Sequence, residues 1–174
     1  FPFFLYVGSR AKYKNFKELL KAFSVWSKKQ DVSLAVVGPE WESDEKKDIS
    51  ELGIADKIIL YKDIDDQSLC YLYNQASAFI YPSLFEGFGI PLLEAMACGC
   101  PIIASPIPST FEVAADIPVY FKFGDVSSWC DAFDKVMLEG KDSEAVRKGF
   151  QHVKQYSWDR NAQETLAVYK SLAN

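Results

Sequence analysis

The stretch Pro82–Ile102, "PSLFEGFGIPLLEAMACGCPI", places a carboxylate where the pattern predicts a core. Glu94 is the only charged residue between Glu86 and Glu112, and Leu, Ala and Met surround it. Burying a carboxylate without a partner costs on the order of several kcal/mol. A glutamate at this position therefore needs a reason other than packing.

The turn before Glu94, "FEGFGIP", has the composition of an anion site at a helix start. Gly87 and Gly89 are predicted to take positive φ and to let the backbone approach a ligand, and Pro91 suits the first helical position. The free N–H groups and the helix dipole favour a phosphate there. Glu94 leans back toward the same place and can accept bonds from ribose hydroxyls, with Glu86 on the opposite lip.

An ordinary interpretation of these glutamates stays open. Glu94 can be an exposed helix residue, and Glu86 a loop carboxylate without a ligand. The gathering of glycines, a proline and two glutamates within this short stretch favours the binding site. Carboxylates on both sides of a phosphate position suit a nucleotide sugar.

On both sides of this stretch, strand-like and helix-like segments alternate along the chain. Strands are predicted at 3–7, 33–38, 57–61, 78–83, 101–105 and 118–121. Helices are predicted at 15–29, within 41–53, after a cap at Asp65 or Asp66, and at 91–98, 126–139, 143–155 and 158–172. Strands that are apolar throughout indicate a parallel sheet covered on both faces, so the fold class is α/β, a doubly wound, Rossmann-like domain. Its ligand is expected at the carboxyl ends of the strands.

The segment after the first strand, "GSRAKYKN", gathers cations before a helix start. Gly8 frees the backbone, and Arg10, Lys12 and Lys14 precede Asn15, which forms a capping-box pattern with Glu18. Cations oppose the dipole at a helix start, so this cluster makes more sense with an anion between them. A solvated basic turn is the alternative. We expect the first and fourth strands to be neighbours, so that both loops face one cleft.

The totals describe one domain of 174 residues with a net charge of −5. This charge offers no basic surface for nucleic acid. No apolar run reaches the ~18 residues that a membrane span needs. The chain opens on Phe1 and an apolar run, without Met, so we expect a piece of a longer protein.

The four cysteines, Cys70, Cys98, Cys100 and Cys130, have apolar flanks. They are predicted to be buried, reduced thiols in a cytoplasmic protein. With no second Cys pair and a single histidine, His152, a zinc site is not expected.

Three segments together resemble a known family. "YVGSRAKYKNFKELLKAF", "PSLFEGFGIPLLEAMACGCPIIAS" and "STFEVAADIPVYF" are similar to the carboxy-terminal, donor-binding domain of GT-B glycosyltransferases of family four (glycosyl transferases group 1). "YSWDRNAQETLAVYKSL" resembles the family's closing helix. The likeness covers nearly the whole chain, and the Glu86-x7-Glu94 spacing is its most specific part.

The resemblance implies a role for each matching residue. Glu86 contacts the transferred sugar as the catalytic residue, and Glu94 binds the ribose hydroxyls. The remaining donor-binding residues that it implies are Gly8, Arg10, Lys14, Tyr61, Lys62, Gly87, Phe88, Gly89, Ile90 and Leu92. The donor is a UDP- or GDP-linked sugar, transfer is retaining, and no metal or other cofactor is required.

The chain departs from the family's pattern in three ways. Ser9 follows Gly8 where the family usually has Arg, so whether Arg10 or Lys12 meets the phosphate stays open. Ala115 stands where Gly is common, a difference expected to matter little. The family's acceptor-binding half precedes this domain, so residues 1–174 should be the nucleotide-sugar-binding domain and should transfer little alone.

For the longer enzyme, the resemblance implies hexose transfer, as by a mannosyltransferase, to a glycan or lipid-linked acceptor in polysaccharide biosynthesis. It also allows a peripheral contact with the inner face of the membrane. A sugar-nucleotide epimerase and a non-catalytic nucleotide-binding or assembly domain are the alternatives. A nicotinamide site is disfavoured because "GFGIP" lacks the third glycine. "DIDD" (63–66) more simply supplies a helix cap than a metal site.

Overall fold

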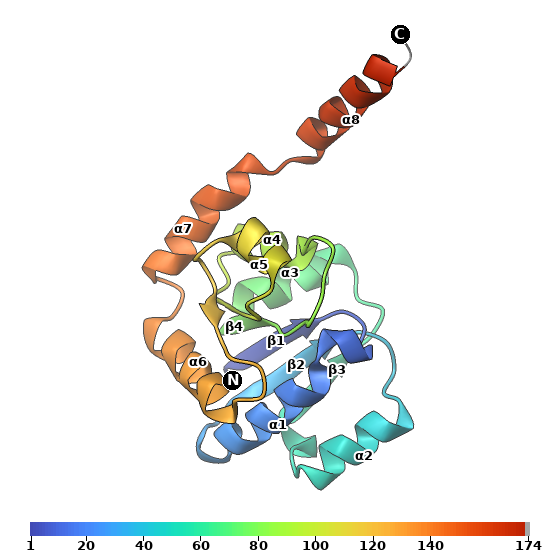
Figure 1. The fold of residues 1–174 in the computed structure, drawn as a ribbon. Coiled ribbons are helices and arrows are strands. Elements are labelled where there is room, and N and C mark those ends of the chain that lie inside the picture. The colour runs from blue at the N-terminus through green and yellow to red at the C-terminus, as the bar shows by residue number, and fades with distance from the viewer. Residues whose placement is uncertain (173–174) are drawn as a thin grey trace.

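The computed structural model describes residues 1–172, which form a six-stranded sheet with helices on both faces (Figure 1). All strand pairs are parallel, in the order β3-β2-β1-β4-β5-β6. This arrangement confirms the doubly wound, Rossmann-like α/β prediction. The strands are β1 (Phe3–Val7), β2 (Ser33–Val37), β3 (Ile58–Tyr61), β4 (Ala78–Tyr81), β5 (Ile102–Ala104) and β6 (Val119–Tyr120).

The helices follow the predicted pattern with one addition. They are α1 (Phe16–Trp26), α2 (Ser43–Glu51), α3 (Asp66–Gln75), α4 (Ile90–Ala97), α5 (Pro108–Ala114), α6 (Val126–Glu139), α7 (Glu144–His152) and α8 (Trp158–Leu172). Short 3-10 turns lie at Lys12–Lys14, Ser27–Lys29, Ala55–Lys57 and Val153–Gln155. Helix α5 was missed by the sequence analysis, because its seven residues are too few to show a helical period. Among the described residues, no helix combines the length and apolarity needed to cross a bilayer.

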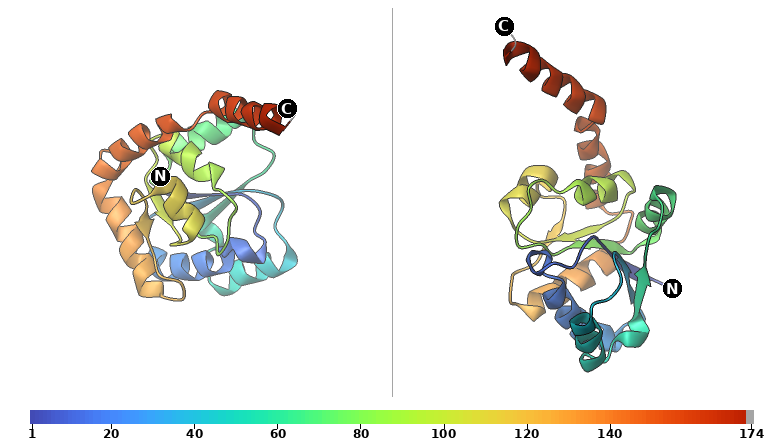
Figure 2. Two further views of the ribbon diagram at one scale, coloured as in Figure 1. Left: turned by 45° about the horizontal axis from the view of Figure 1, so that its top comes forward. Right: turned by 90° about the vertical axis from the view of Figure 1, so that its right-hand side faces the viewer.

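Side-chain alternation along the strands builds a core on each face of the sheet. Phe4 and Tyr6 of β1 point toward the cluster formed with α1 and α6, while Leu5 points toward the cluster formed with α3, α4 and α5. Figures 1 and 2 show these two helical layers on opposite faces of the sheet. Because both faces are covered, every residue of β4 is buried.

The start of α1 differs from the predicted capping box. Asn15 takes a left-handed conformation (φ 56°), and its side chain makes no cap bond. Its Nδ2 donates instead to Glu18 Oε2 at 2.7 Å. Glu18 Oε1 accepts from Gly124 N at 2.7 Å and from Trp129 Nε1 at 3.0 Å. Glu18 therefore joins α1 to the start of α6 rather than closing its own helix.

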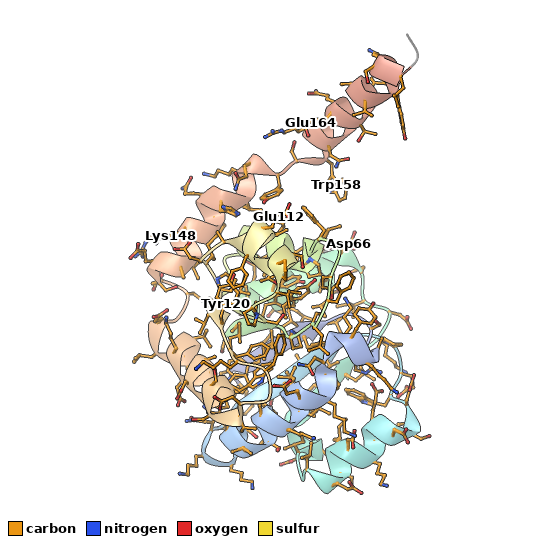
Figure 3. The ribbon with its side chains drawn as sticks, viewed as in Figure 1. Asp66, Glu112, Tyr120, Lys148, Trp158 and Glu164 are labelled. Atoms are coloured by element: carbon orange, nitrogen blue, oxygen red, sulfur yellow. The ribbon has the colours of Figure 1, made fainter. Side chains whose placement is uncertain are left out.

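Helix α8 stands clear of the rest of the chain (Figures 1 and 2). The predicted cap is present, because Ser157 Oγ accepts from Arg160 N at 3.1 Å. No residue of α8 is buried, and its stripe of Trp158, Leu166 and Tyr169 is 75%, 51% and 67% exposed. Figure 3 marks Trp158 at the beginning of this helix.

The cysteine prediction was wrong for three of the four thiols. Only Cys100 is buried, whereas Cys98 and Cys130 are partly exposed and Cys70 is exposed. Cys70 and Cys98 have their Sγ atoms 3.8 Å apart, across α3 and α4. Apolar flanks are a poor guide here because only Leu72 and Tyr73 of α3 are buried, whereas Leu69 is partly exposed and Tyr71 is exposed.

Ala115 occupies a backbone conformation that suits glycine better than alanine. It ends α5 at φ 49° and ψ −125°, outside the left-handed region that L-residues can visit. Such conformations cost on the order of 1–3 kcal/mol. The expectation that this departure from the family pattern matters little is therefore corrected.

Ala115→Gly should raise the free energy of unfolding by about 1 kcal/mol, because it relieves more strain than it adds chain entropy. Urea unfolding of both chains measures the change. Ala97→Gly, at an exposed helical position of α4, is the matched control and should lower stability by about 0.5–1 kcal/mol. Equal losses in the two variants would show that Ala115 is unstrained.

Candidate functional site

The winding direction of the sheet reverses between β1 and β4, which pair directly through Phe4 with Ala78 and Leu5 with Phe79. The loops after these two strands consequently leave the same edge of the sheet at the switch point, where the crevice of this architecture usually holds the ligand. Leu84 N donates to Tyr13 O at 2.7 Å and ties the loops together. The expectation that both loops face one another is confirmed.

Two of the predicted site residues meet across this crevice. Lys14 Nζ lies 2.6 Å from Glu86 Oε1, and the side chains are only 18% and 14% exposed. Tyr81, the last residue of β4, neighbours Glu86. Burial raises the pKa of the Tyr81 phenol, and the Glu86 carboxylate raises it further. The Tyr81 phenol therefore keeps its proton. Lys14, a cation suited to a phosphate, and Glu86, a carboxylate suited to a sugar hydroxyl, thus lie side by side at this edge of the sheet.

The glycine-rich turn forms the start of α4. Gly89 has a φ of 118°, and a Cβ there would lie 3.0 Å from Leu92 Cδ1. Gly87 is not among the residues with positive φ, so the prediction for this glycine was wrong. Nothing lies within 4 Å of a Cβ built on Gly87, which sits on an open part of the loop.

The side chains and amides around this turn differ in access. Phe88 and Ile90 are 44% and 43% exposed, whereas Leu92 is fully buried. The Leu92 N–H already donates to Gly89 O at 3.0 Å, so it is not a free donor in this structure. Donor contacts by these residues stay a prediction.

Glu94 lies in the middle of α4 and is half-buried. Its Oε2 accepts a hydrogen bond of 3.0 Å from Tyr73 Oη of α3. None of the ion pairs between described residues involves Glu94. Tyr73 was not predicted as a site residue, because it belongs to the apolar stripe of its helix and has the pattern of a core residue.

Arg10 makes contacts that its sequence position did not suggest. Its Nε and Nη2 lie 2.6 and 3.0 Å from the two carboxylate oxygens of Glu45, and its side chain is 3% exposed. Nη2 also donates to the carbonyls of Pro39 and Glu40. The guanidinium lies over the Trp41 ring, 4.5 Å from its centroid. Arg10 therefore joins the loop after β1 to α2, and a phosphate contact by Arg10 stays a prediction.

The ends of β1, β2 and β3 are tightly packed at this edge. Gly8 N donates to Val37 O at 2.9 Å, and Gly38 N donates to Tyr61 O at 3.1 Å. A Cβ on Gly38 would lie 2.6 Å from Gly8 O, so only glycine fits there. Lys62 follows Tyr61, and its Nζ lies 2.6 Å from Glu40 Oε2 on an exposed surface. Strands β2 and β1 lie between β3, where Tyr61 ends the strand before Lys62, and β4, which precedes the helix of Glu94. The donor contacts of Tyr61 and Lys62 stay a prediction.

A hollow of about 590 Å³ lies elsewhere, between α7 and the segment before β6, with Asp116, Arg147, Lys148 and His152 in its wall. Figure 3 shows Lys148 on the outer side of α7. Lys148 Nζ lies 3.2 Å from Glu144 Oε1, and His152 Nε2 bonds Val113 O at 2.8 Å. Because these groups already have partners within the chain, the crevice between β1 and β4 is the stronger candidate site.

A profile of the family described as "Glycosyl transferases group 1" matches residues 1–152. The chain belongs to this family. It is 33% identical over 97% of its length to O-antigen chain mannosyltransferase B of Escherichia coli. It is 30% identical over 92% of its length to O-antigen chain mannosyltransferase RfbU of Salmonella typhimurium.

The chain spans 45% of the length of each of these two relatives. Among solved structures, sucrose-phosphate synthase from Thermosynechococcus elongatus superposes with a TM-score of 0.84 at 23% identity, over 98% of this chain and 45% of the other. TarM superposes with a TM-score of 0.80 at 16% identity, over 96% of this chain and 34% of the other. These likenesses confirm the Rossmann-like fold.

Proposed function

We propose that this chain is the domain that binds the nucleotide-sugar donor of a retaining hexosyltransferase, and that a preceding domain of the longer enzyme binds a glycan or lipid-linked acceptor. The observation that carries this proposal is the pairing of Lys14 with Glu86 at 2.6 Å, where β1 and β4 part. Family membership supports a transferase, and the mannosyltransferase names of two relatives favour mannose as the transferred sugar.

Each side chain of the crevice suits one part of such a donor. Lys14 neutralises charge on the diphosphate, and the turn that begins α4 offers its N-terminal dipole. Glu94 accepts hydrogen bonds from the ribose hydroxyls, and Glu86 accepts one from the transferred sugar. Tyr61, the last residue of β3, and Lys62 after it contact the base.

The proposed reaction needs no protein nucleophile. The acceptor hydroxyl oxygen bonds to the anomeric carbon as the bond from that carbon to the diphosphate oxygen breaks. The departing diphosphate takes the acceptor proton on the same face, which retains the anomeric configuration. Fixed cations and dipoles stabilise the charge that develops on the leaving group. Glu86 can orient the sugar while this charge forms.

The proposal places the longer enzyme in polysaccharide biosynthesis in the cytoplasm, with a peripheral contact at the inner face of the membrane. Transfer itself belongs to that longer enzyme, and this chain alone should bind donor weakly and transfer little.

Calorimetric titration of the chain with UDP and with GDP, each with and without Mg²⁺, tests the binding function. One of the two nucleotides should bind, with the same affinity in magnesium and in a chelator. NAD, titrated as a control, should not bind. Failure of both diphosphates to bind at millimolar concentrations, or binding only with Mg²⁺, would contradict the proposal.

A further inference from the structure

Helices α3 and α4 meet through polar groups within an otherwise apolar layer. Tyr73 Oη donates to Glu94 Oε2 at 3.0 Å, and the Sγ atoms of Cys70 and Cys98 approach to 3.8 Å about one turn along each helix. Both helices lie on the same face of the sheet (Figures 1 and 2). Placing a phenol and a carboxylate in an apolar layer costs desolvation free energy, so we expect the geometry of their hydrogen bond to serve a purpose.

The Tyr73 ring is held firmly by its surroundings. It is 1% exposed and packs edge-to-face on Phe79 of β4, with ring centroids 5.3 Å apart. Burial raises the pKa of the phenol strongly, and the neighbouring Glu94 carboxylate raises it further. Tyr73 therefore stays protonated and can only act as the donor toward Glu94. A fixed ring and a fixed proton give the hydroxyl one orientation.

The Glu94 carboxylate is held on one side only. Its Oε2 bonds Tyr73, while Oε1 accepts no hydrogen bond from another described residue. Glu94 is only half-buried, so its carboxylate is not sealed inside the layer. A glutamate side chain has three rotatable bonds, and the phenol bond removes much of that freedom. Oε2 is thereby fixed by Tyr73, while Oε1 stays available to accept a hydrogen bond from a ligand.

We infer that Tyr73 is a positioning residue, which holds the Glu94 carboxylate so that Oε1 faces the crevice ready to accept hydrogen bonds from a vicinal diol. The diol is the ribose of the nucleotide, so the inference rests on the proposed function. Tyr73 itself touches no ligand. The Tyr73 hydroxyl raises nucleotide affinity because the Glu94 carboxylate is already ordered before the nucleotide binds.

The sharpest test is Tyr73→Phe, which removes a single oxygen and keeps the ring packed on Phe79. Chemical-shift titration by NMR measures the dissociation constants of UDP or GDP, whichever binds, and of its 2′,3′-dideoxy analogue. The substitution should weaken the ribonucleotide roughly three- to tenfold and the dideoxy analogue by less than about twofold. Tyr71→Phe is the matched control, because Tyr71 lies on the same helix but is 64% exposed, and it should change neither constant.

A second comparison separates positioning from a general loosening of the helix. In a chain that carries Glu94→Ala, which removes the acceptor of Tyr73, adding Tyr73→Phe should cost less than about twofold in affinity, because the two residues act as one unit. Urea unfolding of all variants confirms that each chain is folded.

The outcomes are distinguishable. Equal losses for the ribonucleotide and the dideoxy analogue, or a full loss in the Glu94→Ala background, would overturn the positioning role. So would unchanged affinity in Tyr73→Phe when Glu94→Gln binds weakly. No binding of any nucleotide by the unaltered chain would overturn the proposed function, and this inference with it.

Discussion

Glu94→Ala should weaken the binding of a nucleoside diphosphate by about 1.5–3 kcal/mol, the range for hydrogen bonds to a charged group. This corresponds to a loss of roughly tenfold to more than a hundredfold. The effect is large because Glu94 has one hydrogen-bond partner among residues 1–172, the Tyr73 hydroxyl, and leaves its second oxygen for a ligand. Calorimetry with UDP and GDP measures the change.

The Glu94→Ala chain should stay folded. Its cost is a Tyr73 hydroxyl left without an acceptor, about 1–3 kcal/mol, while a half-buried charge is removed. Glu94→Gln, which keeps an acceptor of the same shape, separates loss of charge from loss of the hydrogen bond. Nucleotide affinity that is unchanged in the alanine variant would show that Glu94 is not part of the donor site.

Glu45→Ala should lower the free energy of unfolding by about 3–5 kcal/mol, the usual cost of removing one partner from a buried ion pair. Arg10 is the reason, because its side chain is 3% exposed and its guanidinium is held by both oxygens of Glu45. Without Glu45, a buried cation would keep only the carbonyls of Pro39 and Glu40 and the face of Trp41. Denaturant unfolding measures the loss.

The partner substitution gives a matched comparison. Arg10→Met leaves behind Glu45, which is 17% exposed and can reach water, so the loss should be smaller than in Glu45→Ala. Replacing both residues by Met should recover much of the stability, since it removes both charges. A loss below about 1 kcal/mol in Glu45→Ala would mean that the pair is solvated and behaves like a surface salt bridge.

The elements that were predictable from sequence are those with strong local patterns. Strand β1 and helices α6 and α8 have the predicted bounds, because uniform apolarity and a long 3.6-residue period are unambiguous. Asp65 caps α3 as one of the two expected residues, through a 2.7 Å bond from Ser68 N. Helix α5 could not be predicted from its sequence, because seven residues make fewer than two turns and show no clear 3.6-residue period.

The candidate site was predictable only in part. The loops after β1 and β4 follow from the α/β pattern, since a parallel sheet brings strand ends to one edge. The bonds of Glu94 with Tyr73 and of Arg10 with Glu45 were not foreseeable, because they join residues far apart in sequence through the packing of helices. An arginine two residues after Gly8, in a loop that also holds two lysines, looks like a phosphate ligand until its neighbours are known.

The position of β1 in the sheet also has a consequence for how the chain acquires its structure. Its second neighbour, β4, begins only at Ala78, after β2 and β3 have been made. During synthesis, the edge of β1 that will pair with β4 therefore stays unpaired until Ala78 has been added. Pairing of β1 with β4 then has to close a long loop. Because the site requires the first and fourth strands to be neighbours, we expect the chain to refold slowly. We also expect it to self-associate transiently through the unpaired edge of β1.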